Sequence, residues 1–98
     1  MVLKHAAMAG TLESSDLQVT VEPGAEGLEL SLESSVLSQF GKQIESTVLE
    51  VLRTLEVRDA KVTVVDKGAI DCTIRARVEC AVFRAVDQTE GLPWGVKL

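Results

Sequence analysis

Two adjacent serines near the start of the chain are the residues best placed to take part in chemistry. The segment reads Ala-Gly-Thr-Leu-Glu-Ser-Ser-Asp over residues 9–16, so that Ser14 and Ser15 are flanked by two acids and follow a glycine. This composition is typical of an exposed turn, where another enzyme can attach a group to a hydroxyl. The plainer interpretation is a turn or a cap for the strand that follows.

The chain offers no partners that would turn these serines into nucleophiles. His5 is the single histidine, and no Ser/His/Asp arrangement or glycine-rich phosphate loop is present. The neighbouring acids, Glu13 and Asp16, do not lower the pKa of a hydroxyl. We therefore predict no catalytic residues in this chain, and we expect Ser14 to be the substrate of a separate transferase.

The composition limits the class of protein. Ninety-eight residues predict one domain, residues 1–98, and a hydrophobic content of 46% with only three aromatic residues predicts an aliphatic core. A formal net charge of −5 argues against a nucleic-acid partner. No apolar run has the length of a signal peptide or a membrane span, so we expect no membrane association and a cytoplasmic location.

The two cysteines, Cys72 and Cys80, lie eight residues apart. On one helix that spacing is about 12 Å of rise, which is too long for a disulfide. Without a cluster of histidines they also make no metal site. We expect both to be small packing groups in a reducing compartment.

Alternation of apolar and polar residues predicts three strands, over residues 16–22, 28–33 and 60–66. A loop rich in Pro and Gly, residues 23–27, joins the first two strands and predicts an antiparallel hairpin. The third strand ends in the turn Asp66-Lys67-Gly68, where Gly68 suits a positive φ.

Helical periodicity predicts two helices. The first covers about residues 36–54, with Ser34 or Ser35 as its cap. The second covers residues 70–86, although a short strand followed by a helix from about residue 77 fits the same residues.

The two ends of the chain are less regular. Residues 1–15 read as a flexible arm or a short edge strand. Residues 87–98 read as a C-terminal tail, in which Trp94 either folds back on the domain or anchors a partner.

These elements predict a two-layer α+β sandwich, because each apolar face must be buried against another layer. A right-handed crossover makes the second and third strands parallel. If the first strand lies between them, every neighbouring pair is antiparallel. We therefore expect a small antiparallel sheet of order 2-1-3 with both helices on one face, and a serine loop that leaves the start of the central strand.

Three further blocks, together with residues 9–16, give the chain a specific resemblance. They read Gln-Phe-Gly over residues 39–41, Asp-Lys-Gly-Ala-Ile-Asp-Cys over residues 66–72, and Arg-Ala-Arg over residues 75–77. In order and spacing the chain resembles the acyl carrier (gamma) subunit of citrate lyase. In that family the serine preceded by Leu-Glu carries 2'-(5''-phosphoribosyl)-3'-dephospho-coenzyme A through a phosphodiester, which implies attachment at Ser14, with Ser15 the less favoured position.

The resemblance also implies partners. A prosthetic-group transferase would load the arm, whose thiol would carry acetyl and citryl thioesters between an alpha (acyltransferase) and a beta (citryl lyase) subunit as citrate is cleaved to acetate and oxaloacetate. Glu13 and Asp16 either guide the modifying enzyme or merely form the turn. Three arginines, Arg75, Arg77 and Arg84, could bind the phosphates of the arm or contact the larger subunits. The alternative is that they are ordinary solvated residues, with Arg75 and Glu79 forming an i,i+4 pair on the helix.

Three alternatives remain at this point. A carrier subunit of malonate decarboxylase would use the same kind of arm. An ordinary phosphopantetheine carrier is a helical bundle with Asp-Ser-Leu at a helix start, whereas this chain reads Ser-Asp-Leu over residues 15–17, ahead of a strand. The third alternative is an assembly subunit that is never modified.

Overall fold

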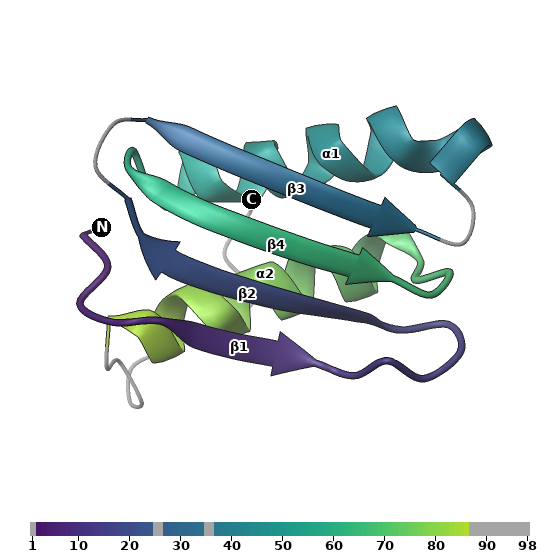
Figure 1. Ribbon diagram of the computed structural model, residues 1–98, viewed down its shortest axis with the longest axis horizontal. Coiled ribbons are helices and arrows are strands. Elements are labelled where there is room, and N and C mark those ends of the chain that lie inside the picture. Colours follow the sequence, from purple (N-terminus) through teal and green to yellow (C-terminus); the bar gives the residue numbers. More distant parts are fainter. Residues whose placement is uncertain (1, 25–26, 35–36, 87–98) are drawn as a thin grey trace.

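The chain forms four strands and two helices in a two-layer α+β arrangement (Figure 1). The computed structural model describes residues 2–24, 27–34 and 37–86, and over 37–40 it describes the backbone. The elements in chain order are β1 (Ala7–Gly10), β2 (Leu17–Pro23), β3 (Leu28–Ser34), α1 (Leu37–Thr54), β4 (Ala60–Asp66) and α2 (Asp71–Ala85).

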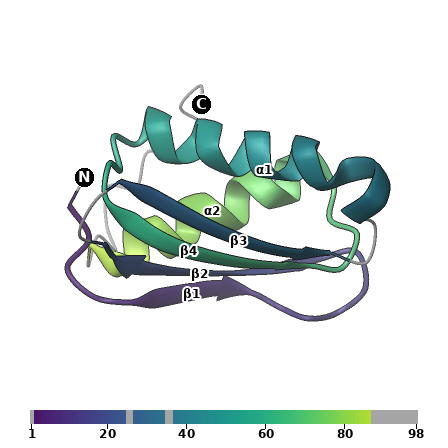
Figure 2. The same cartoon turned by 45° about the horizontal axis from the view of Figure 1, so that its top comes forward.

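The sheet is mixed, with the order β1-β2-β4-β3. Strand β2 pairs antiparallel with both β1 and β4, whereas β3 pairs parallel with β4, with Leu30 opposite Val62. Both helices lie on the same face of this sheet, α1 over β3 and α2 over β1 and β2 (Figure 2). The predicted α+β sandwich with its helices on one face is confirmed, and so is the parallel direction of the second and third predicted strands.

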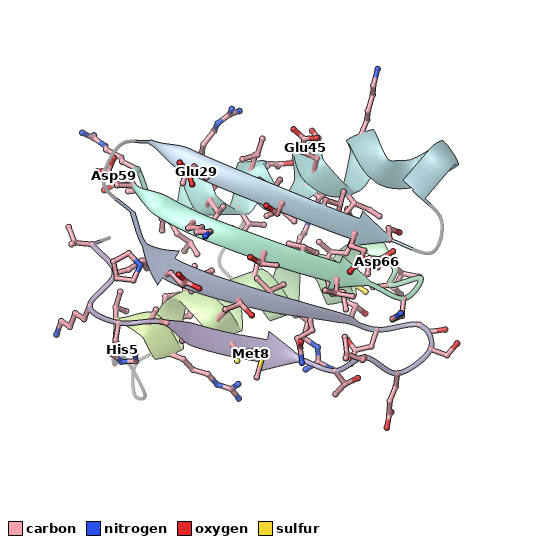
Figure 3. All side chains as sticks on the ribbon, viewed as in Figure 1. His5, Met8, Glu29, Glu45, Asp59 and Asp66 are labelled. Carbon is pink, nitrogen blue, oxygen red and sulfur yellow. The ribbon has the colours of Figure 1, made fainter. Side chains whose placement is uncertain are left out.

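The predicted strand order 2-1-3 and the purely antiparallel sheet are wrong, because residues 28–34 do not pair with residues 17–23. Strand β4 lies between them, so the loop after Pro23 crosses the start of β4 instead of making a hairpin. Asp59 holds this crossing: its carbonyl accepts from Gly24 N–H at 3.4 Å and its carboxylate from Gly27 N–H at 2.7 Å. Figure 3 shows Asp59 at this end of the sheet and Asp66 toward the other end of β4.

The core lies between the sheet and the helices. Inward residues alternate along β2 and β4, and their outward neighbours face the open side of the sheet. Apart from Phe83, the buried apolar residues of the described chain are aliphatic, as predicted. Strand β3 is an edge strand whose three leucines stay only partly buried.

Residues 71–85 are helical along their whole length, so the strand alternative for the start of this segment is wrong. The pattern of exposure shows why: Ile74 and Val78, four residues apart, are buried, whereas Cys72 and Ala76 are exposed. A strand would have placed all four side chains on one face. No helix in the described ranges is both long and apolar enough to cross a bilayer.

The N-terminal segment is structured over residues 7–10, which form edge strand β1 rather than part of a flexible arm. Residues 4 and 5 are also attached, because both backbone N–H groups donate to the Ala85 carbonyl, at 2.9 Å and 3.3 Å. His5 is exposed at the surface (Figure 3). The predicted tail, residues 87–98 with Trp94, and the capping position Ser35 lie outside the described residues.

Candidate functional site

The two serines occupy the tip of a turn between β1 and β2. Asp16 N–H donates to the Glu13 carbonyl at 3.2 Å, which makes Ser14 and Ser15 the two central residues of a β-turn. Both are exposed, and no hydrogen bond to either hydroxyl comes from the part of the chain that the structure describes. Ser15 has a positive φ of 67°, which is rare for a residue with a side chain. The predicted exposed turn is thus confirmed.

Asp16 fixes the base of this turn. Its carboxylate accepts from the Thr11 hydroxyl at 2.7 Å, from Leu17 N–H at 2.8 Å, and from Arg77 Nε and Nη2 at 3.0 Å each. The Thr11 hydroxyl and the Arg77 guanidinium together lower the pKa of Asp16 from 3.8 to about 2. Of the two roles considered for Asp16, the structure shows that of a turn former.

The turn is also attached to the segment that joins β4 to α2. Ser15 N–H donates to the Lys67 carbonyl at 2.8 Å, and Lys67 N–H donates to the Asp16 carbonyl at 2.8 Å. Gly68, next in the chain, has a φ of +93°, as the sequence predicted. The serine turn and residues 67–70 therefore form one end of the molecule, together with the N-terminal ends of both helices (Figure 1).

An Asp16→Asn substitution tests this anchoring. We expect the free energy of unfolding to fall by about 1–2 kcal/mol at pH 7, since a neutral amide cannot replace the charged pair with half-exposed Arg77. Because the pKa of Asp16 is lower in the folded than in the unfolded chain, its contribution is complete above about pH 5 and is lost progressively as the pH falls from there through 2.

Urea unfolding of both proteins between pH 7 and pH 2 measures this difference. Their stabilities should converge toward the acid end of the range. A difference that stays constant down to pH 2 would show that the effect of the substitution has nothing to do with the charge.

The three arginines singled out in the sequence are all engaged by the protein itself. Arg77 binds Asp16 as described, and Arg84 Nη1 donates to the Met8 carbonyl at 2.7 Å. Arg75 donates to Asp71 Oδ2 at 2.9 Å and to Glu50 Oε2 at 3.0 Å.

The expected pair of Arg75 with Glu79 is wrong. Glu79 is only 6% exposed, and burial raises its pKa. Its Oε1 has no hydrogen-bond partner among the described residues. Glu79 therefore lies inside the molecule instead of on the solvated side of α2, where the pairing would have required it.

The cysteines are free thiols on one helix, as expected, but only one of them packs. Cys80 is partly buried against the core, whereas Cys72 is exposed in the first turn of α2. The prediction that Cys72 is a packing group is therefore wrong. Within the described residues, no group of three or more His, Cys, Asp or Glu side chains is arranged to hold a metal ion.

Sequence reasoning missed a groove of about 330 Å³ between the two helices, close to the serine turn. Its lining residues come from α1, from α2 and from the segment that joins β4 to α2: Gln43, Ile44, Thr47, Gly68, Ala69, Ile70, Asp71 and Ile74. This set contains all three isoleucines of the chain. Nothing local in the sequence indicates that the two helices bring them together.

Comparisons with solved structures agree on the fold. One chain of a Pseudomonas malonate decarboxylase hetero-tetramer in complex with malonate superimposes with a TM-score of 0.69 at 23% identity, over 84% of each chain. Homoserine kinase from Cytophaga hutchinsonii superimposes with a TM-score of 0.59 at 9% identity, over 91% of this chain and 38% of the kinase. At these identities the likeness concerns the fold alone.

Comparisons of sequence are more specific. The family described as malonate decarboxylase delta subunit (MdcD) matches residues 4–85. The citrate lyase acyl carrier protein of Vibrio cholerae serotype O1 (strain M66-2) is 55% identical over 95 residues, 96% of each chain. That of Oenococcus oeni is 44% identical over 96 residues, 98% of this chain and 99% of the relative. By these matches over nearly its whole length, the chain belongs to the citrate lyase acyl carrier protein family.

Proposed function

We propose that Ser14 carries 2'-(5''-phosphoribosyl)-3'-dephospho-coenzyme A through a phosphodiester to its hydroxyl. The observation that carries the proposal is the state of this side chain: Ser14 is exposed at the tip of a turn, and no described residue holds its hydroxyl. A transferase can therefore reach the oxygen without breaking a contact. Ser15 is less suited, because its own N–H is bonded to Lys67 and its backbone has a positive φ.

The residues around Ser14 would hold the attachment point of the arm in a fixed position. Asp16, held by Thr11 and Arg77, fixes the base of the turn, so that motion is left to the arm. Exposed Lys67 follows β4 directly beside the turn and offers a positive charge for the arm's phosphates. When bound, the arm supplies a terminal thiol that carries acyl groups. The tether keeps them at an effective concentration on the order of mM for the enzymes that act on them.

The partners follow from this role. The chain would act as the non-catalytic carrier of a lyase complex, in which an alpha subunit transfers the acyl group and a beta subunit cleaves the citryl form. A separate transferase would load the arm. The net charge of −5 favours docking on basic surfaces of these proteins.

The intact mass of the protein, expressed with and without the modifying enzymes, tests the proposal. We expect the co-expressed protein to gain the mass of one arm, and fragmentation should locate it on residue 14. Without these enzymes the mass should equal that of the bare chain. A bare mass in both preparations would favour the unmodified assembly subunit, and a group on Ser15 would move the site by one residue.

A carrier of malonate decarboxylase is the second candidate, favoured by the description of the matching family. Because that carrier would bear the same kind of arm, mass alone does not separate the two. Reconstitution does: the loaded protein should support citrate cleavage with the large subunits of citrate lyase. Malonate decarboxylation with the corresponding decarboxylase subunits, in the absence of citrate cleavage, would reverse the assignment.

A further inference from the structure

The groove between α1 and α2 opens at the same end of the molecule as the serine turn. Ser15, the residue directly after Ser14, donates its N–H to the Lys67 carbonyl. Lys67 is followed directly by Gly68, Ala69 and Ile70, which line the groove. A group attached to Ser14 therefore begins within a few residues of the groove.

The walls of the groove are aliphatic. Ile44 from α1 and Ile74 from α2 are each 4% exposed and form its inner side. Ile70 also lines the groove and is 66% exposed, so its apolar side chain is open to a ligand there. The face of a flat aromatic ring can leave water against such aliphatic carbon.

Polar groups lie around these walls. Exposed Gln43 offers an amide that can both donate and accept. The Asp71 carboxylate accepts from Thr47 Oγ1 at 3.1 Å and from Arg75, which lowers its pKa and keeps it charged. At the start of α2, Ile70 provides no side-chain cap, and the N–H groups of Asp71 and Cys72 have no acceptor among the described residues. Hydrogen-bond donors and acceptors therefore surround the apolar walls of the groove.

We propose that this groove holds the adenine ring of the arm attached to Ser14, an assignment that rests on the attachment proposed above. The arm runs from Ser14 Oγ through the phosphate and a first ribose to the ribose of the adenosine, which bears the base, and this path extends roughly 10 Å at ordinary covalent bond lengths. The adenine is thus the first flat aromatic ring along the arm, and its faces are the first surface of the arm suited to aliphatic walls. The exocyclic amine can donate to Asp71 or Gln43, and the ring nitrogens can accept from the open N–H groups of α2.

The size of the groove agrees with a nucleoside. Its volume of about 330 Å³ is at the low end of the 300–1,000 Å³ that is usual for small-molecule sites, so it has no room for the whole arm. With the adenine held, only the pantetheine end beyond it would swing between partner enzymes. The carrier would then present its thiol from a position fixed by α1 and α2, in addition to the serine bond.

The isoleucine methyl groups provide a direct test. The chain has three isoleucines, at positions 44, 70 and 74, and all of them line the groove. Isoleucine δ1-methyl labelling therefore gives three NMR signals that all report on it. In the protein carrying the arm we expect ring-current shifts of these signals relative to the bare chain, and nuclear Overhauser effects from the adenine H2 and H8 protons.

Two matched variants distinguish binding of the adenine in this groove from a general effect of the arm on the spectrum. Ile70→Glu places a charge at the exposed margin of the groove and should abolish the Overhauser effects to the two remaining isoleucines. Met8→Glu makes the same kind of change on β1, at a residue that is 50% exposed and away from the groove, and should leave them intact. Intact mass is measured on each sample.

The outcomes distinguish the two proposals. An arm that is present, but gives no Overhauser effects to the isoleucine methyl groups and no shift of their signals, would overturn the assignment of the groove and leave the attachment standing. Effects that persist unchanged in Ile70→Glu would also overturn it. A sample that gains no arm would overturn the attachment at Ser14, and the groove assignment with it.

Discussion

A Ser14→Ala variant, expressed with the modifying enzymes, gains no arm and leaves the reconstituted lyase without turnover. We expect citrate cleavage to fall by at least a factor of roughly 10³, since without the arm no tethered thiol carries the acyl group between the subunits. Citrate cleavage by the reconstituted complex and intact mass are measured on the same preparation. The fold should be unaffected, because an exposed side chain without contacts contributes within about 0.5 kcal/mol.

Ser15→Ala is the matched control, since it removes the neighbouring hydroxyl from the same turn. We expect it to keep both the arm and the activity. A loss of the arm in both variants would indicate that the transferase reads the turn as a whole. Normal turnover by Ser14→Ala would contradict the carrier role of this residue.

A Gly10→Ala substitution destabilises the protein by about 3 kcal/mol or more, because the glycine meets two constraints at once. Its φ is +92°, and an added Cβ would overlap the carbonyl oxygen of Leu17 and lie 3.3 Å from Arg77 Cδ. The left-handed backbone alone costs about 1–2 kcal/mol with a side chain. The rest comes from displacing β2 from β1 at the base of the serine turn. Urea unfolding at pH 7 measures the loss.

Gly68→Ala separates the two constraints. Gly68 has a φ of +93°, but an added Cβ there meets nothing within 4 Å. We therefore expect it to cost only about 1–2 kcal/mol, the backbone component. Equal losses in the two variants would show that the close approach of β1 to β2 adds nothing.

The approximate boundaries of β2, β3, β4 and both helices were predictable from the sequence because periodicity reflects burial directly, whereas β1 was foreseen only as one of two alternatives for residues 1–15. Leu17, Val19 and Val21 alternate since one face of β2 is covered, and both helical stripes were found for the same reason. Which strands are neighbours was not predictable in this way. Alternation shows which side of the sheet a residue faces, but not which strand lies beside it. The short loop after Pro23 is compatible both with a hairpin and with a connection that crosses β4.

For the candidate site, too, local features were predictable from the sequence and contacts between distant segments were not. The serine turn was predictable because Gly, Ser and Asp signal a turn locally. Its anchoring was not, since Asp16 and Arg77 lie 61 residues apart and each is an ordinary charged residue in its own segment. The groove was missed because the isoleucines that form it come from separate elements.

The position of β4 between β2 and β3 has a consequence during synthesis of the chain. The ribosome makes both flanking strands first, and the strand that joins them, residues 60–66, emerges later. Until then the N-terminal half has no partner for β3 and no Lys67 to hold the serine turn. A modifying enzyme that recognises the anchored turn would therefore act on finished chains and pass over nascent ones.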